Sequence, residues 1–204
     1  HGVHVTGITL SGPQAARARQ RAQEAGVADR VDIRVADYRD MRGETFDAIA
    51  SIGMVEHVGA VNIDAYSRTL AGLLQPGGRL LNHGICRPPV SRDALPVTVP
   101  KSPWERRTFI DRFVFPDGEL HELGTVISSM QQQGFEVRHS ETLREHYGLT
   151  LRAWVANLEA NWDAAVAATS EGRARVWRLY MAAAALMFER GRTQVHQLLG
   201  VTTP

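Results

Sequence analysis

The chain contains very little cysteine and very little lysine. Cys86 is its single cysteine and Lys101 its single lysine among 204 residues. One thiol excludes an internal disulfide framework and a cysteine-based metal cluster, which fits a reducing compartment. Arginine supplies the remaining positive charge, and the formal net charge is only +1. The sequence therefore lacks the basic excess that is typical of nucleic-acid-binding domains, and we expect no nucleic acid partner.

Long hydrophobic runs are also missing. The longest apolar run covers residues 179–188 and lies between Arg178 and Glu189. It is too short for a helix that crosses a bilayer, which needs about 20 apolar residues. With 44% apolar residues the chain can still bury one sizeable core. We expect a single domain that at most touches a membrane surface.

Strand-like and helix-like segments alternate in the first half of the chain. An opening strand leads to Ser11, which can cap a helix that carries Pro13 in its first turn and stops at Gly26. Apolar or alternating patterns predict three more strands, at 31–35, 46–52 and 79–85. A further helix is predicted at 62–74, between the last two strands. This alternation predicts an α/β fold with a mostly parallel sheet and helices on both faces.

The regular pattern breaks between residues 87 and 122. This segment holds six of the nine prolines and shows little periodicity, so we interpret it as an insertion over the active edge of the sheet. A helix over 120–133 and a strand over 135–142 follow, and then two long helical stretches. Aromatic and aliphatic residues recur at helical spacing in the first of these stretches, which predicts one face toward the core: Tyr147, Leu151, Trp154, Leu158 and Trp162.

Polar residues follow several of the predicted strands. In open parallel sheets, ligands bind beyond the carboxyl ends of the strands, where Thr9, Asp37, Glu56 and His83 lie in this sequence. Asp37 could accept a hydrogen bond from an adenine amino group while the ring of Tyr38 lies against the base. The alternative interpretation is an aspartate that caps a turn.

A carboxylate and an imidazole, Glu56 and His57, come directly after a buried strand with glycine on both sides. Glycine at such a position lets the backbone approach a ligand. Alternatively, Glu56 is a favourable charge at a helix N-terminus and His57 a structural histidine. His83 would lie near Glu56 if the two strands are neighbours. Two histidines and one glutamate form a weak zinc pattern, so we predict no metal site, and Tyr147 is most simply a core aromatic.

Taken together, these motifs resemble the cyclopropane-fatty-acid synthase family of S-adenosylmethionine-dependent methyltransferases, which includes the mycolic acid cyclopropane synthases. The resemblance runs through nearly the whole chain and implies the Rossmann-like fold of class I methyltransferases. It is carried by an ordered set of motifs: GITLS at 7–11 with Gln14, DYRD at 37–40, FD at 46–47, SIGMVEHVG at 51–59, LLNHGI at 80–85, FIDRFVFPDG at 109–118 and HYGLTLRAW at 146–154.

The resemblance implies roles for individual residues. The cofactor S-adenosylmethionine would contact seven of them: Thr9, Leu10 and Gln14 on the ribose and methionine side, Asp37 and Tyr38 at the adenine, and Ser51 and Gly53 around the end of the third predicted strand. A bicarbonate ion would be held by Glu56, His83 and Tyr147 and by the backbone of Ile85.

The resemblance also implies a reaction. The methyl group is transferred to a cis double bond of a phospholipid acyl chain, and bicarbonate then removes a proton from the carbocation to close a cyclopropane ring. Residues 87–122 would shape the lipid channel. The enzyme is expected in the bacterial cytoplasm, peripheral to the inner membrane. Three alternatives remain: a methyl-branching fatty acyl enzyme, a methyltransferase of small molecules, and a non-catalytic fragment that completes a split enzyme.

The chain departs from the family because the first strand and its glycine-rich loop are absent. We therefore expect residues 1–204 to be the C-terminal part of a methyltransferase domain. The family's first strand lies in the centre of the sheet, so its loss would leave unpaired backbone groups. We expect a complementing chain, a domain swap or upstream residues to supply this part.

Overall fold

The computed structural model describes residues 1–89 and 108–203. Its chain divides into two compact units, His1–Phe46 and Asp47–Pro204, which are described separately here. Within the described ranges, no helix combines the length and the apolar character needed to cross a membrane.

The first unit is a β-α-β arrangement. Strands β1 (Val5–Thr9) and β2 (Val31–Val35) pair in parallel, with helix α1 (Gly12–Glu24) between them in the chain. The hydroxyl of Ser11 accepts a hydrogen bond from the backbone N–H of Gln14, so the predicted cap is confirmed. A short 3₁₀ helix, η1 (Tyr38–Asp40), follows β2. The carboxyl ends of both strands therefore meet at one edge of this small sheet.

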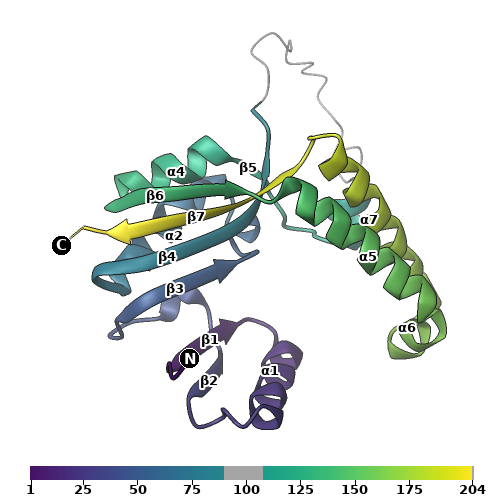
Figure 1. The fold of residues 1–204 in the computed structure, drawn as a ribbon, viewed down its shortest axis with the longest axis horizontal. Helices are drawn as coiled ribbons and strands as arrows, with labels where there is room; N and C mark the ends of the chain where they lie inside the picture. The colour runs from purple at the N-terminus through teal and green to yellow at the C-terminus, as the bar shows by residue number, and fades with distance from the viewer. Residues whose placement is uncertain (90–107, 204) are drawn as a thin grey trace. The chain divides into compact units, whose positions relative to one another are not determined.

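The second unit contains a mixed sheet with the strand order β3-β4-β7-β6. These strands are β3 (Phe46–Ile52), β4 (Leu74–Arg87), β7 (Gln194–Thr202) and β6 (Phe135–Thr142), and a short β5 (His121–Glu122) pairs in parallel with the end of β4. Strand β7 is antiparallel to both of its neighbours. Figure 1 shows β3 pointing in the direction opposite to β7.

Helices α2 (Ile63–Gly72) and α4 (Leu123–Gln132) lie on the same side of this sheet (Figure 1). Two short 3₁₀ helices, η2 (Val55–His57) and η3 (Ala60–Asn62), join β3 to α2. The hydroxyls of Ser67 and Ser129 are 2.8 Å apart in the contact between α2 and α4. The hydroxyl of Tyr66 lies 2.7 Å from the Ser51 hydroxyl and 2.7 Å from the side-chain carbonyl of Asn82. This buried network ties α2 to β3 and β4.

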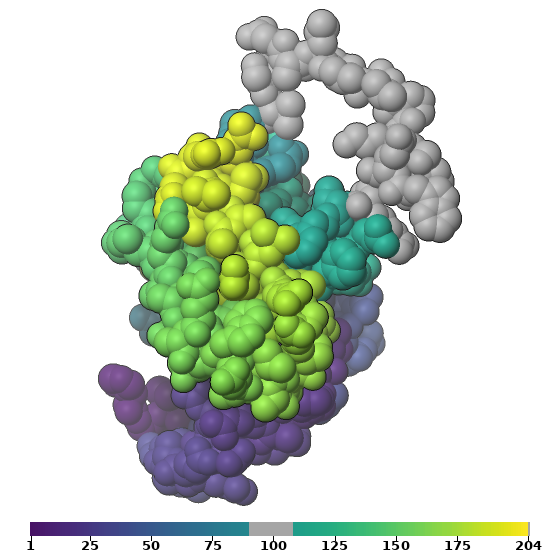
Figure 2. Space-filling model, turned by 90° about the vertical axis from the view of Figure 1, so that its right-hand side faces the viewer, coloured from purple at the N-terminus to yellow at the C-terminus, as the bar shows by residue number. Residues whose placement is uncertain are grey.

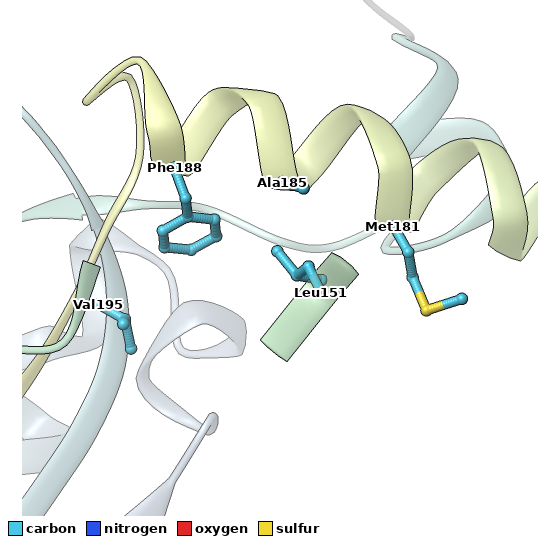
Figure 3. Close-up of a cluster of buried hydrophobic side chains, with 5 residues drawn as sticks. All are labelled: Leu151, Met181, Ala185, Phe188 and Val195. Atoms are coloured by element: carbon cyan, nitrogen blue, oxygen red, sulfur yellow. The ribbon is translucent and has the colours of Figure 1, made fainter. Parts of the chain in front are cut away.

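Helices α5 (Arg144–Ala160) and α7 (Glu171–Glu189) form a pair at the end of the sheet, with α6 (Trp162–Ala168) between them in the chain. Figure 2 shows these helices on the face toward the viewer. Their shared core consists of five buried side chains, drawn in Figure 3: Leu151, Met181, Ala185, Phe188 and Val195. Ile85 of β4 and Tyr147 of α5 pack against this cluster, so the core continues onto the sheet.

Most of the predicted elements are confirmed. The strands predicted at 31–35, 46–52 and 135–142 have these bounds in the structure. The helix predicted at 120–133 starts later, because His121 and Glu122 pair with β4 before it begins. Of the predicted 87–122 insertion, residues 90–107 lie outside the described residues, and its described part contains α3 (Phe109–Phe113) and β5.

Strand β7 was not predicted. Because it runs antiparallel to β4 and β6, the sheet of the second unit is mixed, where a mostly parallel sheet was predicted. Burial alternates from His196 to Thr202, but of the four buried positions only Leu198 is apolar and large. The strand therefore lacks the alternation of apolar and polar residues that identifies a half-buried strand in a sequence.

The buried tyrosine network leads to a stability prediction. Replacing Tyr66 by Phe leaves the buried polar groups of Ser51 and Asn82 short of a partner, so we expect a loss of about 1–2 kcal/mol in the free energy of unfolding. Chemical denaturation followed by circular dichroism measures it. Thr69→Ala, which removes an exposed hydroxyl of the same helix, is the control and should change stability by less than about 0.5 kcal/mol. Equal losses in both variants would contradict the assigned role.

Candidate functional site

In the first unit, three predicted residues gather where β1 leads into α1. The hydroxyl of Thr9 donates to the side-chain oxygen of Gln14 at 2.9 Å and accepts from the backbone N–H of Ser11 at 3.1 Å. The side chain of Leu10 lies between them in the chain and is 74% exposed. The backbone N–H of Ala36 donates to Thr9 O at 3.1 Å, which joins the end of β1 to the end of β2. The result is a polar strand edge with one exposed apolar side chain.

Asp37 and Tyr38 lie at the end of the neighbouring strand β2. The carboxylate of Asp37 caps η1 by accepting from the backbone N–H of Arg39 at 2.9 Å, which confirms the capping interpretation. It also pairs with the guanidinium of Arg39 at 2.7 Å. Hydrogen bonding from Arg39 holds the pKa of Asp37 below its usual value, so this acceptor stays ionised. Burial raises the pKa of Tyr38, whose ring is half-buried.

Arg39 is a residue that the sequence reasoning missed. Its side chain is 72% exposed, and its partner Asp37 is much less so. The sequence signal is that Arg39 follows Asp37 by two residues. This spacing brings a basic side chain back to the carboxylate that caps the same turn.

In the second unit, two residues were predicted to contact the cofactor, Ser51 near the end of strand β3 and Gly53 just after it, and their surroundings differ. Gly53 has φ +63° and space where a side chain would be, and its N–H donates to the carbonyl of His83 at 2.8 Å. This left-handed conformation favours glycine and turns the chain away from the sheet. Ser51 is buried, and its hydroxyl belongs to the Tyr66 network, so the structure places this side chain in the core.

Glu56 is buried at 8% exposure, and one of its carboxylate oxygens, Oε1, accepts from the backbone N–H of Ile85 at 2.8 Å. Strand β3 ends at Ile52, whereas β4 continues to Arg87. The N–H of Gly53 makes the last hydrogen bond from this part of the chain to β4, at the carbonyl of His83. The carboxylate of Glu56 then accepts from the next free N–H of β4, that of Ile85. Gly84 permits this approach, because a Cβ there would clash with Val55.

The backbone of Ile85 was predicted to hold bicarbonate, and in the structure its N–H has a protein partner. It donates to Glu56 instead, because the carboxylate lies beside the part of β4 that extends past β3. The second carboxylate oxygen, Oε2, is buried and lacks a hydrogen-bond partner among the described residues. An unpaired buried carboxylate oxygen is costly, and such atoms point to a bound group that supplies the missing donor.

The negative charge of Glu56 affects the pKa of two tyrosines and a cysteine. Burial, followed by the charge of Glu56, raises the pKa of Tyr147. Burial raises the pKa of Tyr180 to about 12, with further contributions from Tyr147 and Glu56. The pKa of Cys86 rises to about 11 for the same two reasons as that of Tyr147. All three groups therefore remain protonated near neutral pH, and both phenols are potential hydrogen-bond donors.

Tyr180 and Cys86 were not among the predicted site residues. Tyr180 lies within the apolar run 179–188, which by pattern alone reads as a core helix. Its closeness to Tyr147 arises only when α5 and α7 pack together.

His83 lies on β4, directly opposite Gln197 on β7. The Nδ1 atom of its ring is 3.2 Å from the amide nitrogen of Gln197, and both side chains are half-buried. The structure thus brings Glu56 and the backbone of His83 and Ile85 to one stretch of β4, with Tyr147 near the carboxylate.

The segment that follows the undescribed residues holds the loop that carries Glu56. The N–H of Glu119 donates to the carbonyl of Glu56 at 2.8 Å, and its carboxylate accepts from the N–H of Ala60 at 2.8 Å. The ring of Phe115 meets the rings of His57 at 5.8 Å and Tyr180 at 5.5 Å between centroids. His57 therefore has an aromatic contact of its own, which favours the structural interpretation of this residue.

The surroundings of Glu56 lead to a prediction on ionisation. Replacing Glu56 by Gln removes a negative charge, so the pKa of Tyr180 should fall from about 12, by up to about one unit. Titration by ¹³C NMR of labelled tyrosine rings, assigned with Tyr180→Phe, measures it. Glu171→Gln, which removes an exposed charge paired with Arg175, should leave the titration unchanged. A rise in the Tyr180 pKa, or no change in Glu56→Gln, would contradict the arrangement.

Comparisons with known proteins agree on one family. The model of a family described as mycolic acid cyclopropane synthetase matches residues 1–198. A probable fatty acid methyltransferase of Mycobacterium tuberculosis is 43% identical over 97% of this chain and 44% of its own length. A probable fatty acid methyltransferase of Pseudomonas putida is also 43% identical, over 97% of this chain and 48% of its own length. The chain thus spans about half the length of these relatives.

A solved structure gives the same result for the fold. The mycolic acid cyclopropane synthase CmaA1, crystallised with SAH and CTAB, is 29% identical and superposes with a TM-score of 0.86, covering 99% of this chain and 71% of that chain. The family model matches nearly every residue, and the superposition includes both units. The chain belongs to the mycolic acid cyclopropane synthetase family and has the α/β fold of its class I S-adenosylmethionine-dependent methyltransferases.

Proposed function

We propose that this chain is the catalytic part of a methyltransferase that transfers a methyl group from S-adenosylmethionine to the double bond of a fatty acyl chain. The observation that carries the proposal is the buried carboxylate of Glu56, whose Oε2 lacks a partner among the described residues and lies near two protonated tyrosines. The relatives support the substrate class, since two of them are named as probable fatty acid methyltransferases.

The first unit suits the adenosyl and methionine parts of the methyl donor. The ionised carboxylate of Asp37 can accept from the adenine amino group, and the half-buried ring of Tyr38 can lie against the base. Thr9 and Gln14 offer a hydroxyl and an amide at the neighbouring strand end, and exposed Leu10 offers an apolar contact. When bound, S-adenosylmethionine supplies an electrophilic methyl group on a sulfonium sulfur. Support also comes from CmaA1, whose structure contains SAH.

The second unit suits the chemistry of an alkene. An isolated alkene is a poor nucleophile, so it must be aligned with the methyl group in a place that excludes water. Aromatic side chains near Glu56 offer such walls, because the rings of Phe115 and Tyr180 meet edge to face. Methyl transfer leaves positive charge on the acyl chain. A buried carboxylate and aromatic ring faces stabilise positive charge strongly where water is excluded.

The proton that leaves the acyl chain needs a base, and the residues near Glu56 fit the bicarbonate ion that the sequence predicts. The unpaired Oε2 of Glu56 can accept from the hydroxyl of such an ion, and the phenol of Tyr147 can donate to its oxygens. When bound, bicarbonate supplies a base for the proton that is lost after methyl transfer. As the family resemblance implies, the side chain of His83 would be the third to hold the ion, after those of Glu56 and Tyr147. The N–H of Ile85 would orient Glu56 for this contact, since it donates to the carboxylate.

Within this function we propose ring closure on a phospholipid acyl chain, at the surface of a membrane. The second candidate is a methyl-branching enzyme, which the names of the two relatives favour. Both reactions begin with the same cation. Ring closure takes the proton from the transferred methyl carbon, whereas loss of a proton from a neighbouring chain carbon leaves a methyl-branched chain that keeps a double bond. A non-catalytic fragment would have no need of an anion site, and the open acceptor of Glu56 beside two protonated tyrosines suits such a site.

The reaction can be tested in bacteria that make no cyclopropane lipids. Cells that express the full-length protein should accumulate ring-containing acyl chains, and Glu56→Gln should reduce them about 100-fold, because the oriented carboxylate is lost. Gas chromatography with mass spectrometry of fatty acid methyl esters measures both. The control variant Glu171→Gln breaks an exposed ion pair on α7, and cells that express it should still make the product. Methyl-branched chains would establish the second candidate, and an unchanged lipid profile would contradict both.

The cofactor site can be tested separately by calorimetry with S-adenosylhomocysteine. Asp37→Ala removes the acceptor proposed for adenine, so we expect about tenfold weaker binding, which corresponds to about 1.4 kcal/mol. Arg39→Ala is the matched control, because it removes the ion pair but leaves the carboxylate in place. It should bind like the parent protein. Equal losses in the two variants would assign Asp37 to holding its own loop.

A further inference from the structure

We propose that Gln197 is a positioning residue that keeps His83 in the tautomer with its hydrogen on Nε2. This inference rests on the proposed function, in which His83 contacts the anion beside Glu56. It assigns a role to a residue of β7, the strand that the sequence patterns did not predict.

The orientation of the Gln197 amide assigns the tautomer. The amide nitrogen of Gln197 lies 3.2 Å from Nδ1 of His83. With its nitrogen turned toward His83, the amide donates, and we assign Nδ1 as the ring nitrogen that carries no hydrogen. In a neutral imidazole the hydrogen then lies on Nε2, which becomes a donor.

The strand register keeps the two side chains opposite each other. His83 and Gln197 are direct partners of the β4–β7 pairing, and so are Ile85 and Val195. Directly paired residues project from the same face of a sheet. Val195 is fully buried in the cluster with Leu151 and Phe188, and a one-residue slip of β7 would expel it from that core. The packing of α5 and α7 therefore also holds Gln197 in place.

This tautomer decides what His83 can do. With hydrogen on Nε2, the ring can donate to an anion at that nitrogen and cannot accept a proton there. His83 then binds and orients the anion, and the proton from the acyl chain goes elsewhere. If the hydrogen were on Nδ1, the ring would instead offer Nε2 as an acceptor and would compete as a base.

The decisive substitution is Gln197→Glu. A carboxylate only accepts, so it draws the hydrogen of His83 to Nδ1. We expect ¹⁵N NMR of histidine-labelled full-length protein to show hydrogen on Nε2 in the parent and on Nδ1 in the variant, with the His83 signal assigned by His83→Asn. Product formation in the fatty acid assay should fall about tenfold in the variant.

Two further variants guard against a merely structural effect. Gln194→Glu changes the same residue type on the same strand, beside His196, and should leave the His83 tautomer and the product unchanged. Glu141 of β6 is also a direct partner of position 197, so a glutamate there would face a like charge. If this charge prevents folding, Gln197→Leu is the substitute variant, and it should give a mixture of the two tautomers. The thermal midpoint of each variant is measured alongside.

The outcomes separate this inference from the proposed function. Hydrogen on Nδ1 in the parent protein would overturn the inference, and so would full activity in a Gln197→Glu variant whose tautomer has changed. The NMR result does not depend on activity. A parent protein that makes neither rings nor branches would contradict the proposed function while the tautomer assignment stands.

Discussion

The candidate site depends on one hydrogen bond, from the N–H of Ile85 to the carboxylate of Glu56. Strand β4 runs beyond the end of β3, so this N–H needs an acceptor that no strand supplies. A buried amide without one would cost about 1–3 kcal/mol. Satisfying it with a carboxylate brings a negative charge into the interior, and that charge raises the pKa of Tyr147 and Tyr180. The need of the β4 N–H for an acceptor thus explains why a negative charge lies in the site.

Strand β7 is the second constraint. It pairs along β4 and β6 at once, and Val195 anchors it in the core formed with α5 and α7. The same pairing sets Gln197 opposite His83. On the other side of Glu56, Glu119 and Phe115 hold the loop that follows β3. Side chains proposed for chemistry are therefore supported by backbone pairing and by packing.

Several features could be predicted because their causes are local. Ser11 and Pro13 specify the start of α1, and alternating or apolar runs specify β2 and β3. The ends of predicted strands pointed to Glu56 and His83, and the resemblance to a known family gave these two residues and Tyr147 their roles. It also led to Ser51, whose hydroxyl the structure commits to the core through Tyr66, a residue 15 positions away. A motif names positions, but it does not say whether a side chain turns toward a ligand or into the interior.

By itself, the sequence determined the α/β class, the order of most elements and the family, because caps, periodicity and motifs are properties of neighbouring residues. Only the tertiary structure decided how these residues are used. Glu56 and Ile85 are 29 positions apart, and His83 and Gln197 are 114 apart. Such partners meet because sheet register and helix packing bring them together. The acceptor of the Ile85 N–H, the protonated state of Tyr180 and the neighbour of His83 therefore belong to the fold and cannot be read from a local pattern.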